Sequence, residues 1–320
     1  MLCFFLENTD PYFCLAAEEY LLKNYTDDIF MLWQSHNTVV VGKHQNALGE
    51  INYRRVRENG IKVARRISGG GTVFHDKGNV NFTFIKNVSG PQEISFKRFT
   101  QPITDALATM GITAVTSGRN DLLVDNRKIS GNAEHIFKNR VLHHGTLLYN
   151  SDLNNLGNAI RIVSGKYTSK AVQSNRSVVV NISEFLDNPP PIEDFIRMIL
   201  RFQLELSTSN QLYTLSSQES EIIRKLSAEK FETWEWQFGY SPAYCFSNEG
   251  IWKDKELVVQ LNAEKGKITE LKLEGDAFSN NHKSMLLQHM RGIYHNYEAI
   301  ARLHDQSGIE YDEDLIYLWF

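Results

Sequence analysis

Two arginines and a serine stand directly before three glycines in RRISGGG, residues 65–71, and these residue types suit the binding of an anion. Glycine lets a ligand approach bare backbone, whose N–H groups can donate hydrogen bonds, while arginine supplies positive charge. The flanking stretches IKVARRI and TVFH alternate apolar and polar residues, which predicts a strand on each side. Walker A loops and dinucleotide fingerprints both need a helix after the glycines, so neither fits. A flexible hairpin turn is the alternative interpretation of the glycines alone.

A second pentad, RKISG at residues 127–131, repeats the pattern of RRISG at residues 65–69. Residues i and i+2 of a strand face the same side, so we expect Arg66 to project with Ser68, and Lys128 with Ser130. Two such pairs on one sheet could grip one anion, or two anions of one substrate, from different sides. Chance repetition of common residue types is the alternative.

Histidines and cysteines give no metal pattern. His75, His143 and His144 lack the accompanying Cys or HxH partners of a closed zinc site, so we interpret them as packed, hydrogen-bonded side chains. The three cysteines are far apart and form no CxxC motif, which favours a reducing, cytoplasmic compartment.

Composition limits the class of protein. The chain has 320 residues, 42% of them hydrophobic, and a net charge of −4. It is long enough for one large core and a smaller one, and it lacks the basic excess of a nucleic-acid-binding protein. The N-terminus has no basic segment typical of a signal or transit peptide, and no apolar run approaches the roughly 20 residues that span a bilayer. We therefore expect neither a nucleic-acid nor a membrane partner.

The order of the predicted elements indicates an α+β fold. A helix is expected after Asp10-Pro11, and strands are expected at residues 29–33, 38–43, 61–67, 72–75 and 80–85. Further helices are predicted at residues 92–110, from about 192 to 206 and at 216–231, with hairpins centred on Asp125-Asn126 and Lys265-Gly266. The absence of a steady βαβ rhythm argues against a doubly wound sheet. We place a domain boundary between residues 1–245 and a small C-terminal unit, residues 246–320.

Taken together, these motifs resemble the lipoate–protein ligase A family. The resemblance runs through RRISGGGTVFHDKGNVNFTF at 65–84, SGRNDLLVDNRKISGNA at 117–133 and HHGTLL at 143–148. Weaker similarities are DPYFCLAAEEYLL at 10–22 and WEWQFGYSPAY at 234–244. The resemblance implies a mixed-sheet α+β domain of the class II aminoacyl-tRNA synthetase and biotin-ligase type, with a small α+β accessory domain.

The implied reaction explains why two anions would meet. Lipoate and ATP, with Mg²⁺, form lipoyl-AMP and pyrophosphate, and the acyl group then passes to a lysine of a lipoyl domain. Such domains occur in the E2 subunits of 2-oxoacid dehydrogenases and in the glycine cleavage H protein. The site must hold a carboxylate against a triphosphate, and a cation within about 4 Å of both would offset their repulsion.

The resemblance also assigns roles to single residues. Lys128 matches a lysine that contacts the acyl carbonyl and the phosphate, and we give it an electrostatic role. Asp121 is the candidate Mg²⁺ ligand, because that ion favours hard oxygen ligands. The implied lipoate-binding residues are Trp33, Arg66, Ser68, Gly69, Gly70, His75 and His144. The implied ATP-binding residues are Gly71, Val73, Phe74, Lys128, Lys170 and Arg176.

One loop departs from the family pattern. The adenylate-binding loop of the family has a Lys-Gly pair and a later S-x-R-S run, whereas this chain has SKAVQSNRSVVVNI at residues 169–182. Ala171 stands in place of the glycine, and Val178 in place of a second arginine. If the glycine position needs a positive φ, Ala171 would be strained there, which would affect loop closure.

Three other interpretations remain open. An octanoyl or lipoyl transferase of the same fold would need a cysteine nucleophile, but no cysteine lies between residues 15 and 244. A biotin ligase has a different glycine-arginine loop. A non-catalytic lipoyl-domain binder would not need Lys128, Asp121 and the three glycines together. The sequence leaves the choice between lipoate and octanoate, the acceptor and the oligomeric state open.

Overall fold

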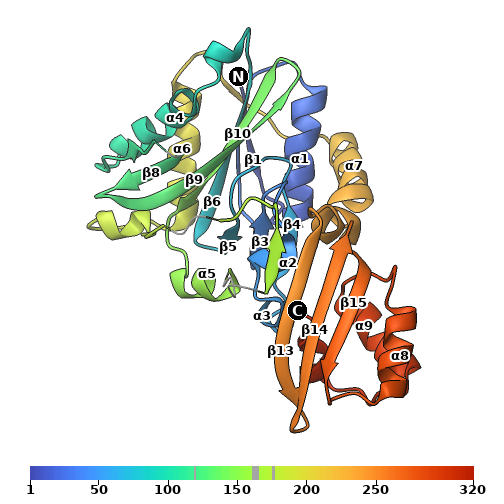
Figure 1. The fold of residues 1–320 in the computed structure, drawn as a ribbon. Helices are drawn as coiled ribbons and strands as arrows, with labels where there is room; N and C mark the ends of the chain where they lie inside the picture. Colours follow the sequence, from blue (N-terminus) through green and yellow to red (C-terminus); the bar gives the residue numbers. More distant parts are fainter. Residues whose placement is uncertain (119, 161–165, 175–176) are drawn as a thin grey trace. The chain divides into compact units, whose positions relative to one another are not determined.

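A computed structural model describes residues 1–118, 120–160, 166–174 and 177–320 (Figure 1). The chain divides into two compact units, each made of separate segments. The first contains Met1–Gly42, Lys62–Gly157 and Ser174–Glu232. The second contains Lys43–Ile61, Asn158–Gln173 and Thr233–Phe320. The boundary after residue 245 stays a prediction, since the second unit also draws on two segments that precede it.

The first unit is built on a mixed sheet of eight strands in the order β12-β1-β2-β6-β10-β9-β8-β7. The pairs β12–β1 and β1–β2 are parallel, and the pairs from β2 onward are antiparallel. A second sheet has the order β4-β3-β5. The strands are β1 (Leu2–Leu6), β2 (Ile29–Trp33), β3 (Thr38–Val41), β4 (Lys62–Arg65), β5 (Val73–His75), β6 (Asn79–Asn87), β7 (Val115–Thr116), β8 (Asp121–Val124), β9 (Arg127–Phe137), β10 (Arg140–Leu148) and β12 (Gln211–Leu212).

Helices cover both faces of the large sheet. Helices α4 and α6 lie side by side, and their apolar stripes form the main core with alternate residues of the sheet (Figure 1). Helix α1 instead contacts β6 and β10, and it begins at Pro11 because the Asp10 carboxylate accepts hydrogen bonds from the N–H groups of Tyr12 and Phe13. The helical segments from α1 to η3 are α1 (Pro11–Asn24), η1 (Pro91–Glu93), α4 (Phe96–Ala108), α5 (Leu153–Ala159), η2 (Ile182–Phe185), α6 (Ile192–Glu205), α7 (Ser217–Leu226) and η3 (Ser227–Phe231).

The second unit has its own sheet and core. Its strand order is β11-β13-β14-β15, and aromatic and aliphatic residues from the sheet and the last three helices form a separate cluster. The elements are α2 (Ala47–Glu50), α3 (Tyr53–Glu58), β11 (Tyr167–Ser169), η4 (Glu235–Gly239), β13 (Tyr244–Trp252), β14 (Lys255–Glu264), β15 (Lys267–Gly275), α8 (Asn280–His289), α9 (Tyr297–Gln306) and α10 (Glu313–Tyr317). Within the described residues, no helix is long and apolar enough to cross a membrane.

Both predicted hairpins are confirmed, and their turn residues explain them. Asp125 and Asn126 have φ angles of 48° and 61° between β8 and β9, and Lys265 and Gly266 have φ angles of 50° and 71° between β14 and β15. Two consecutive residues with positive φ match the twist of a two-residue hairpin, and Asn, Asp and Gly tolerate that conformation best. The first of these hairpins carries Lys128.

Candidate active site

A bulge in the first hairpin decides which way the second pentad faces. Lys128 pairs with Leu123, whereas Ser130 pairs with Leu122, so Ile129 is an extra residue in β9. Because consecutive residues of β8 face opposite sides of the sheet, Lys128 and Ser130 also face opposite sides. The prediction that these two side chains project together is therefore wrong. Ser130 is fully buried, while Lys128 stays partly open to solvent.

The same bulge brings Lys128 to Asp121. Asp121 pairs with Gly131, two positions along β8 from the partner of Lys128 and hence on the same face. Nζ of Lys128 lies 2.9 Å from Oδ1 of Asp121, with the two side chains 22% and 19% exposed. A methyl group at Gly131 would lie 3.1 Å from that Nζ, so the ammonium group rests directly over this glycine.

The side chain of Arg66 lies over the three glycines at residues 69–71, the glycine turn. Its Nη2 donates to the carbonyl oxygens of Gly69 at 2.7 Å and Gly71 at 2.6 Å, and its Nη1 donates to that of Val40 at 3.1 Å. Gly70 has a φ of +84°, and a Cβ there would lie 3.0 Å from Nη2, so the turn needs glycine at this position. Burial lowers the pKa of Arg66 to about 10. Through its hydrogen bonds to Gly69 and Gly71, the guanidinium holds the carbonyl groups of the turn in place.

The two pentads belong to different sheets. Arg66 and Ser68 follow β4 of the three-stranded sheet, whereas Lys128 and Ser130 lie in β9 of the eight-stranded sheet. The prediction of two cation–hydroxyl pairs on one sheet is therefore wrong. The first pair itself is formed, because Nε of Arg66 donates to Oγ of Ser68 at 3.0 Å.

His144 continues this contact into a buried network. Its Nε2 lies 2.6 Å from Oγ of Ser68, and its Nδ1 lies 2.9 and 3.0 Å from the two carboxylate oxygens of Glu18 on α1. Glu18 and Ser68 are fully buried, and His144 is 7% exposed. Sequence reasoning assigned no role to Glu18, although it lies within the stretch LAAEEYLL, where a charged residue on the buried face of a helix is unusual.

Trp33 and His75 line another side of the same region. Nε1 of Trp33 donates to Oγ1 of Thr83 at 3.2 Å, and Thr83 donates in turn to Glu18 at 2.6 Å. The rings of Trp33 and His75 meet edge to face, with their centroids 5.6 Å apart. Oγ of Ser35 lies 2.8 Å from Nδ1 of His75. Nε2 of His75 is buried without a hydrogen-bond partner among the described residues.

The charge state of His75 follows from its surroundings. Burial, followed by the nearby positive charge of Arg66 and the proximity of His144, lowers the pKa of His75 to about 3. His75 is therefore neutral at physiological pH. With one ring nitrogen bound to Ser35, it retains one nitrogen as a hydrogen-bonding group for a ligand.

The predicted adenine-contacting residues lie on an edge strand. Val73 and Phe74 are in β5, where they pair with Val40 and Val39 of β3. Phe74 is 5% exposed, and Val73 is half-buried. Their backbone contacts with adenine stay a prediction.

The loop that departs from the family pattern is anchored at two points in the first unit. Oγ of Ser174 accepts a hydrogen bond from the N–H of Thr72 at 2.8 Å, beside Gly71. Lys128 donates its backbone N–H to Val178 at 2.9 Å and accepts from Val180 at 3.0 Å. The loop is thus tied both to the glycine turn and to the main chain of Lys128.

The remaining predictions for this loop have different outcomes. Lys170 is exposed and belongs to the second unit, and Arg176 lies outside the described residues. Ala171 is not among the described residues with positive φ, and its N–H donates to Oγ of Ser169 at 3.2 Å. The strain expected from alanine at this position is therefore absent from the described backbone.

Metal ligands are sparse at this site. Among the residues that the structure describes, no three His, Cys, Asp or Glu side chains are grouped to hold a metal ion. Asp121 supplies one carboxylate, which fits Mg²⁺, since this ion is commonly held by one or two carboxylates together with substrate phosphates. It does not fit a closed structural site of zinc type.

The cysteines are free and mostly buried. Burial raises the pKa of the Cys3 thiol to about 11, and the pKa of Cys14 is raised well above its ordinary value by burial and by the nearby carboxylates of Asp10 and Glu18. Neither thiol is poised to ionise as a nucleophile needs. Cys245 is exposed in β13 of the second unit.

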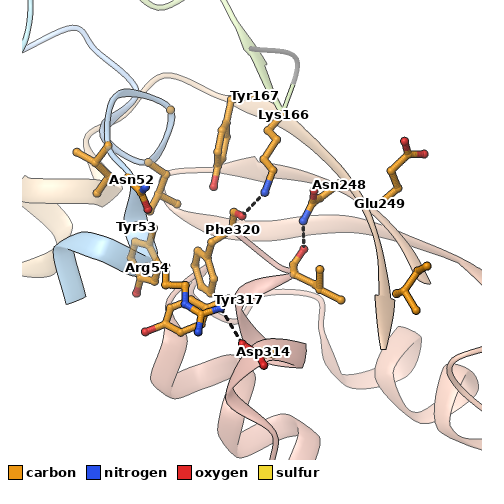
Figure 2. Close-up of a pocket in the computed structure, with 15 residues that line it drawn as sticks. Asn52, Tyr53, Arg54, Lys166, Tyr167, Asn248, Glu249, Asp314, Tyr317 and Phe320 are labelled. Carbon is orange, nitrogen blue, oxygen red and sulfur yellow. Dashed lines mark hydrogen bonds and ion pairs between the residues drawn. The ribbon is translucent and has the colours of Figure 1, made fainter. Parts of the chain in front are cut away.

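The second unit contains a separate pocket of about 540 Å³ (Figure 2). Tyr53 stacks on Phe320, with their ring centroids 4.0 Å apart, and Nζ of Lys166 donates to the Phe320 carbonyl oxygen at 3.0 Å. The hydroxyl of Tyr167 is buried there without a hydrogen-bond partner in the described part of the chain. None of the predicted site residues lines this pocket.

Comparison with known families defines the class of protein. Residues 10–202 match the model of the lipoyl protein ligase A/B catalytic domain, and residues 241–313 match that of the bacterial lipoate protein ligase C-terminus. These two matches span most of the chain. The catalytic-domain match contains all the predicted site residues.

Individual relatives agree with the family models. Lipoate–protein ligase 1 of Staphylococcus aureus is 39% identical over 306 residues, which cover 95% of this chain and 92% of the relative. Lipoate-protein ligase LplJ of Bacillus subtilis is 38% identical over 281 residues, covering 86% and 85%. The chain belongs to the lipoate–protein ligase family, a family of enzymes.

Solved structures confirm the fold. The structure of P. falciparum LipL1 in complex with lipoate has a TM-score of 0.63 and 24% identity, and the match covers 99% of this chain and 97% of that one. A lipoate-protein ligase A bound with ATP has the same TM-score and identity and covers 74% of this chain and 98% of that one. The expected mixed α+β fold of these ligases is therefore confirmed.

Proposed function

We propose that this protein uses ATP to convert lipoate into lipoyl-AMP and then transfers the lipoyl group to a lysine of a lipoyl domain. The observation that carries the proposal is the position of Lys128, whose ammonium group is held beside Asp121 at 2.9 Å. Its side chain is only 22% exposed, so its charge is less screened than that of a surface lysine. A relative with bound lipoate and another with bound ATP support both substrates.

In the first step, a carboxylate oxygen of lipoate attacks the α-phosphorus of ATP, and the bond from that phosphorus to the pyrophosphate oxygen breaks. Lys128 stabilises the negative charge that accumulates between the two reactants. Because its backbone is fixed by the bulged hairpin and by residues 178 and 180, the ammonium group is positioned before the substrates bind.

In the second step, the uncharged amine of the acceptor lysine attacks the acyl carbonyl of lipoyl-AMP. The bond from the carbonyl carbon to the phosphate oxygen breaks, so AMP leaves and a proton is released as the amide forms. The adenylate is needed because a free carboxylate would have to expel oxide, whereas AMP is a phosphate leaving group. We assign to Lys128 the stabilisation of the oxyanion in this step as well.

Asp121 is the residue we assign to Mg²⁺, with the remaining ligands coming from phosphate oxygens and water. When bound, the ion supplies charge neutralisation for the phosphates. Lys128 already pairs with this carboxylate, so cation and anion at the site are balanced before substrate binds.

The acyl chain is proposed to lie along Trp33 and His75, near His144 and Ser68. The eight-carbon chain of lipoate gains about 0.8 kcal/mol for each CH₂ that it buries. The unpartnered Nε2 of His75 is a polar group available to the bound substrate. The predicted nucleotide contacts of Gly71, Val73, Phe74, Lys170 and Arg176 complete this proposal.

The acceptors we propose are lipoyl domains of 2-oxoacid dehydrogenase E2 subunits and of the glycine cleavage H protein. A structural neighbour is described as a bi-partite lipoate protein ligase and its E2 lipoyl domain from Thermoplasma acidophilum, which supports this class of acceptor. We also propose residues 1–245 as the catalytic domain and 246–320 as the accessory domain. Three free cysteines favour a cytoplasmic location.

The proposal is tested by incubating the protein with ATP, Mg²⁺, lipoate and an isolated apo-lipoyl domain. We expect one AMP and one pyrophosphate for each lipoylated domain, measured by mass spectrometry and product analysis. Transfer from another acyl carrier without ATP would favour the transferase. Binding of the lipoyl domain without either product would favour a non-catalytic binder. Parallel reactions with octanoate determine the acyl preference.

A further inference from the structure

Glu18 is a carboxylate buried on α1 at the junction of two hydrogen-bond chains. It is 0% exposed, and among the described residues its ion-pair partner is His144. Its neighbour Glu19 is also buried, but it pairs with Lys23 and Lys230 at 2.5 Å each. The two adjacent carboxylates therefore have different tasks, since Glu19 joins α1 to η3 whereas Glu18 points into the candidate active site.

The first chain leads from Trp33 to Glu18. The indole N–H of Trp33 can only donate, so Thr83 accepts it at 3.2 Å. The Thr83 hydroxyl then donates its own proton to Oε1 of Glu18 at 2.6 Å. Each donor in this chain has one acceptor, and the last acceptor is the carboxylate.

The second chain leads from the glycine turn to Glu18. Arg66 can only donate, so Oγ of Ser68 accepts from its Nε at 3.0 Å. A carboxylate can only accept, so Nδ1 of His144 carries the proton toward Glu18. In neutral His144, Nε2 is then an acceptor, and it receives the hydroxyl proton of Ser68 at 2.6 Å. The carboxylate at one end and the guanidinium at the other thus fix the direction of every hydrogen bond between them.

We propose that Glu18 is a positioning residue for acyl activation. Glu18 fixes His144 in the form that carries a proton on Nδ1. Through Ser68 and Arg66 it holds the glycine turn in place. Through Thr83 it holds the indole of Trp33. This inference rests on the proposed function, because the two chains end on residues that we assign to the lipoate site. Glu18 itself acts through these neighbours.

Electrostatics support the assignment. Arg66 is buried, with 6% of its surface exposed, and its guanidinium contacts neutral oxygens. The favourable charge that opposes the lowering of its pKa by burial comes from Glu18. A buried cation is costly unless an anion compensates it, so loss of the Glu18 charge weakens the clamp on the glycine turn.

The test is a double-mutant cycle of Glu18→Gln and Ser68→Ala, measured by the steady-state kinetics of lipoate activation. Gln keeps the size of Glu but removes the charge and places an amide N–H among donors. We expect each single variant to lose roughly 10-fold in kcat/KM for lipoate, with the KM for ATP changed less than about 2-fold. We expect kcat/KM for lipoate in the double variant to be no lower than in the less active single variant, because both changes break the same chain.

Glu19→Gln is the matched control on the same helix. It removes a buried carboxylate whose ion-pair partners, Lys23 and Lys230, belong to neither chain, so the KM for lipoate should stay unchanged even if the melting temperature falls. A structural role for Glu18 predicts that Glu18→Gln lowers the melting temperature and leaves the KM for lipoate of the folded fraction unchanged. Additive effects of Glu18→Gln and Ser68→Ala would also overturn the proposal.

Two further measurements keep the test decisive. If Glu18→Gln does not fold, the coupling between Ser68→Ala and Thr83→Val, whose chains meet at Glu18, carries the same prediction, and additive effects contradict it. In ¹⁵N spectra of the wild-type imidazoles, assigned through His144→Gln, Nδ1 of His144 should bear the proton. A proton on Nε2 alone would contradict the proposal even if the wild-type protein showed no lipoate activation.

Discussion

His143 and His144 are adjacent in β10, yet they face opposite sides of the sheet. His143 stacks on Phe99 of α4, with ring centroids 5.0 Å apart, and burial lowers its pKa. His144 instead binds Glu18 and Ser68 on the side of α1. The strand alternation that separates them assigns one histidine to the core and the other to the candidate active site.

Replacement of Gly70 by alanine is expected to damage the glycine turn. A side chain at a φ of +84° is strained, and the new Cβ would press on Nη2 of Arg66 at 3.0 Å. We expect a loss of about 1 kcal/mol or more in the free energy of unfolding, measured by urea denaturation, together with a rise in the KM for lipoate. Gly69→Ala is the matched control for stability, because a Cβ at Gly69 meets open space. Equal stability of the two variants would contradict the account of this turn.

Asp121→Asn is expected to raise the Mg²⁺ concentration needed for half-maximal activation of lipoate. Asparagine keeps one oxygen but removes the charge that attracts the ion. Asp125→Asn is a suitable control, because it removes a carboxylate from the same hairpin at a φ of 48°, which asparagine tolerates. The Mg²⁺ requirement, measured by titration, should change only for Asp121→Asn. The same increase in both variants would remove Asp121 from its assigned role.

The second unit is expected to lose stability in mild acid. Burial lowers the pKa values of His295 and His304 to about 4, below the roughly 6.5 of an unfolded histidine. The unfolded state therefore binds protons first as the pH falls. The contribution of the two neutral histidines to the free energy of unfolding is complete above about pH 6.5. It is lost between there and about pH 4, by up to roughly 3 kcal/mol for each histidine.

His304→Phe tests this pH dependence. The ring of His304 lies against Phe278 and Trp319, so phenylalanine preserves an aromatic group without a titrating nitrogen. The difference in the free energy of unfolding between pH 7.5 and pH 5, measured by urea denaturation, should become smaller. His289→Gln, at an exposed position on α8, should leave the difference unchanged. An unaltered pH dependence in His304→Phe would contradict the assignment.

Cys14→Ala separates the ligase from a cysteine-dependent transferase. Sγ of Cys14 is buried and lies 3.1 Å from the carbonyl oxygen of Asn8, and its raised pKa disfavours the thiolate. We expect the variant to activate lipoate at close to the wild-type rate, with some loss of thermal stability. A hydroxylamine-sensitive acyl group on a cysteine of the wild-type protein, detected by mass spectrometry, would favour the transferase.

Much of the fold could be predicted from local sequence. Asp10-Pro11 marks the start of α1, runs of β-forming residues mark β2 and β3, and alternation of apolar and polar residues marks β4 to β6, because these signals depend on neighbouring residues only. The hairpin at Asp125-Asn126 could also be predicted, from its turn residues. These signals fix the elements but not their pairing.

Less of the geometry of the candidate site could be predicted from the sequence. Nothing in RKISG marks Ile129 as a bulge, and the bulge reverses the side that Ser130 faces relative to Lys128. The separation of the pentads into two sheets depends on long-range pairing. Glu18 resembles any other glutamate of a helix until α1 is packed against β6 and β10. Residue types were thus predictable, whereas the partners that give them roles required the tertiary structure.

The central claim is that Lys128 carries the activation of lipoate by ATP. It is tested most directly by lipoate-dependent exchange of labelled pyrophosphate into ATP, with wild-type protein beside Lys128→Ala and the exposed control Lys97→Ala. We expect exchange by the wild type and by the Lys97 variant, and a rate lower by at least about 100-fold in the Lys128 variant, the usual effect of losing one transition-state contact. Near-wild-type exchange by Lys128→Ala, or no lipoate-dependent exchange by folded wild-type protein with Mg²⁺, would contradict the account.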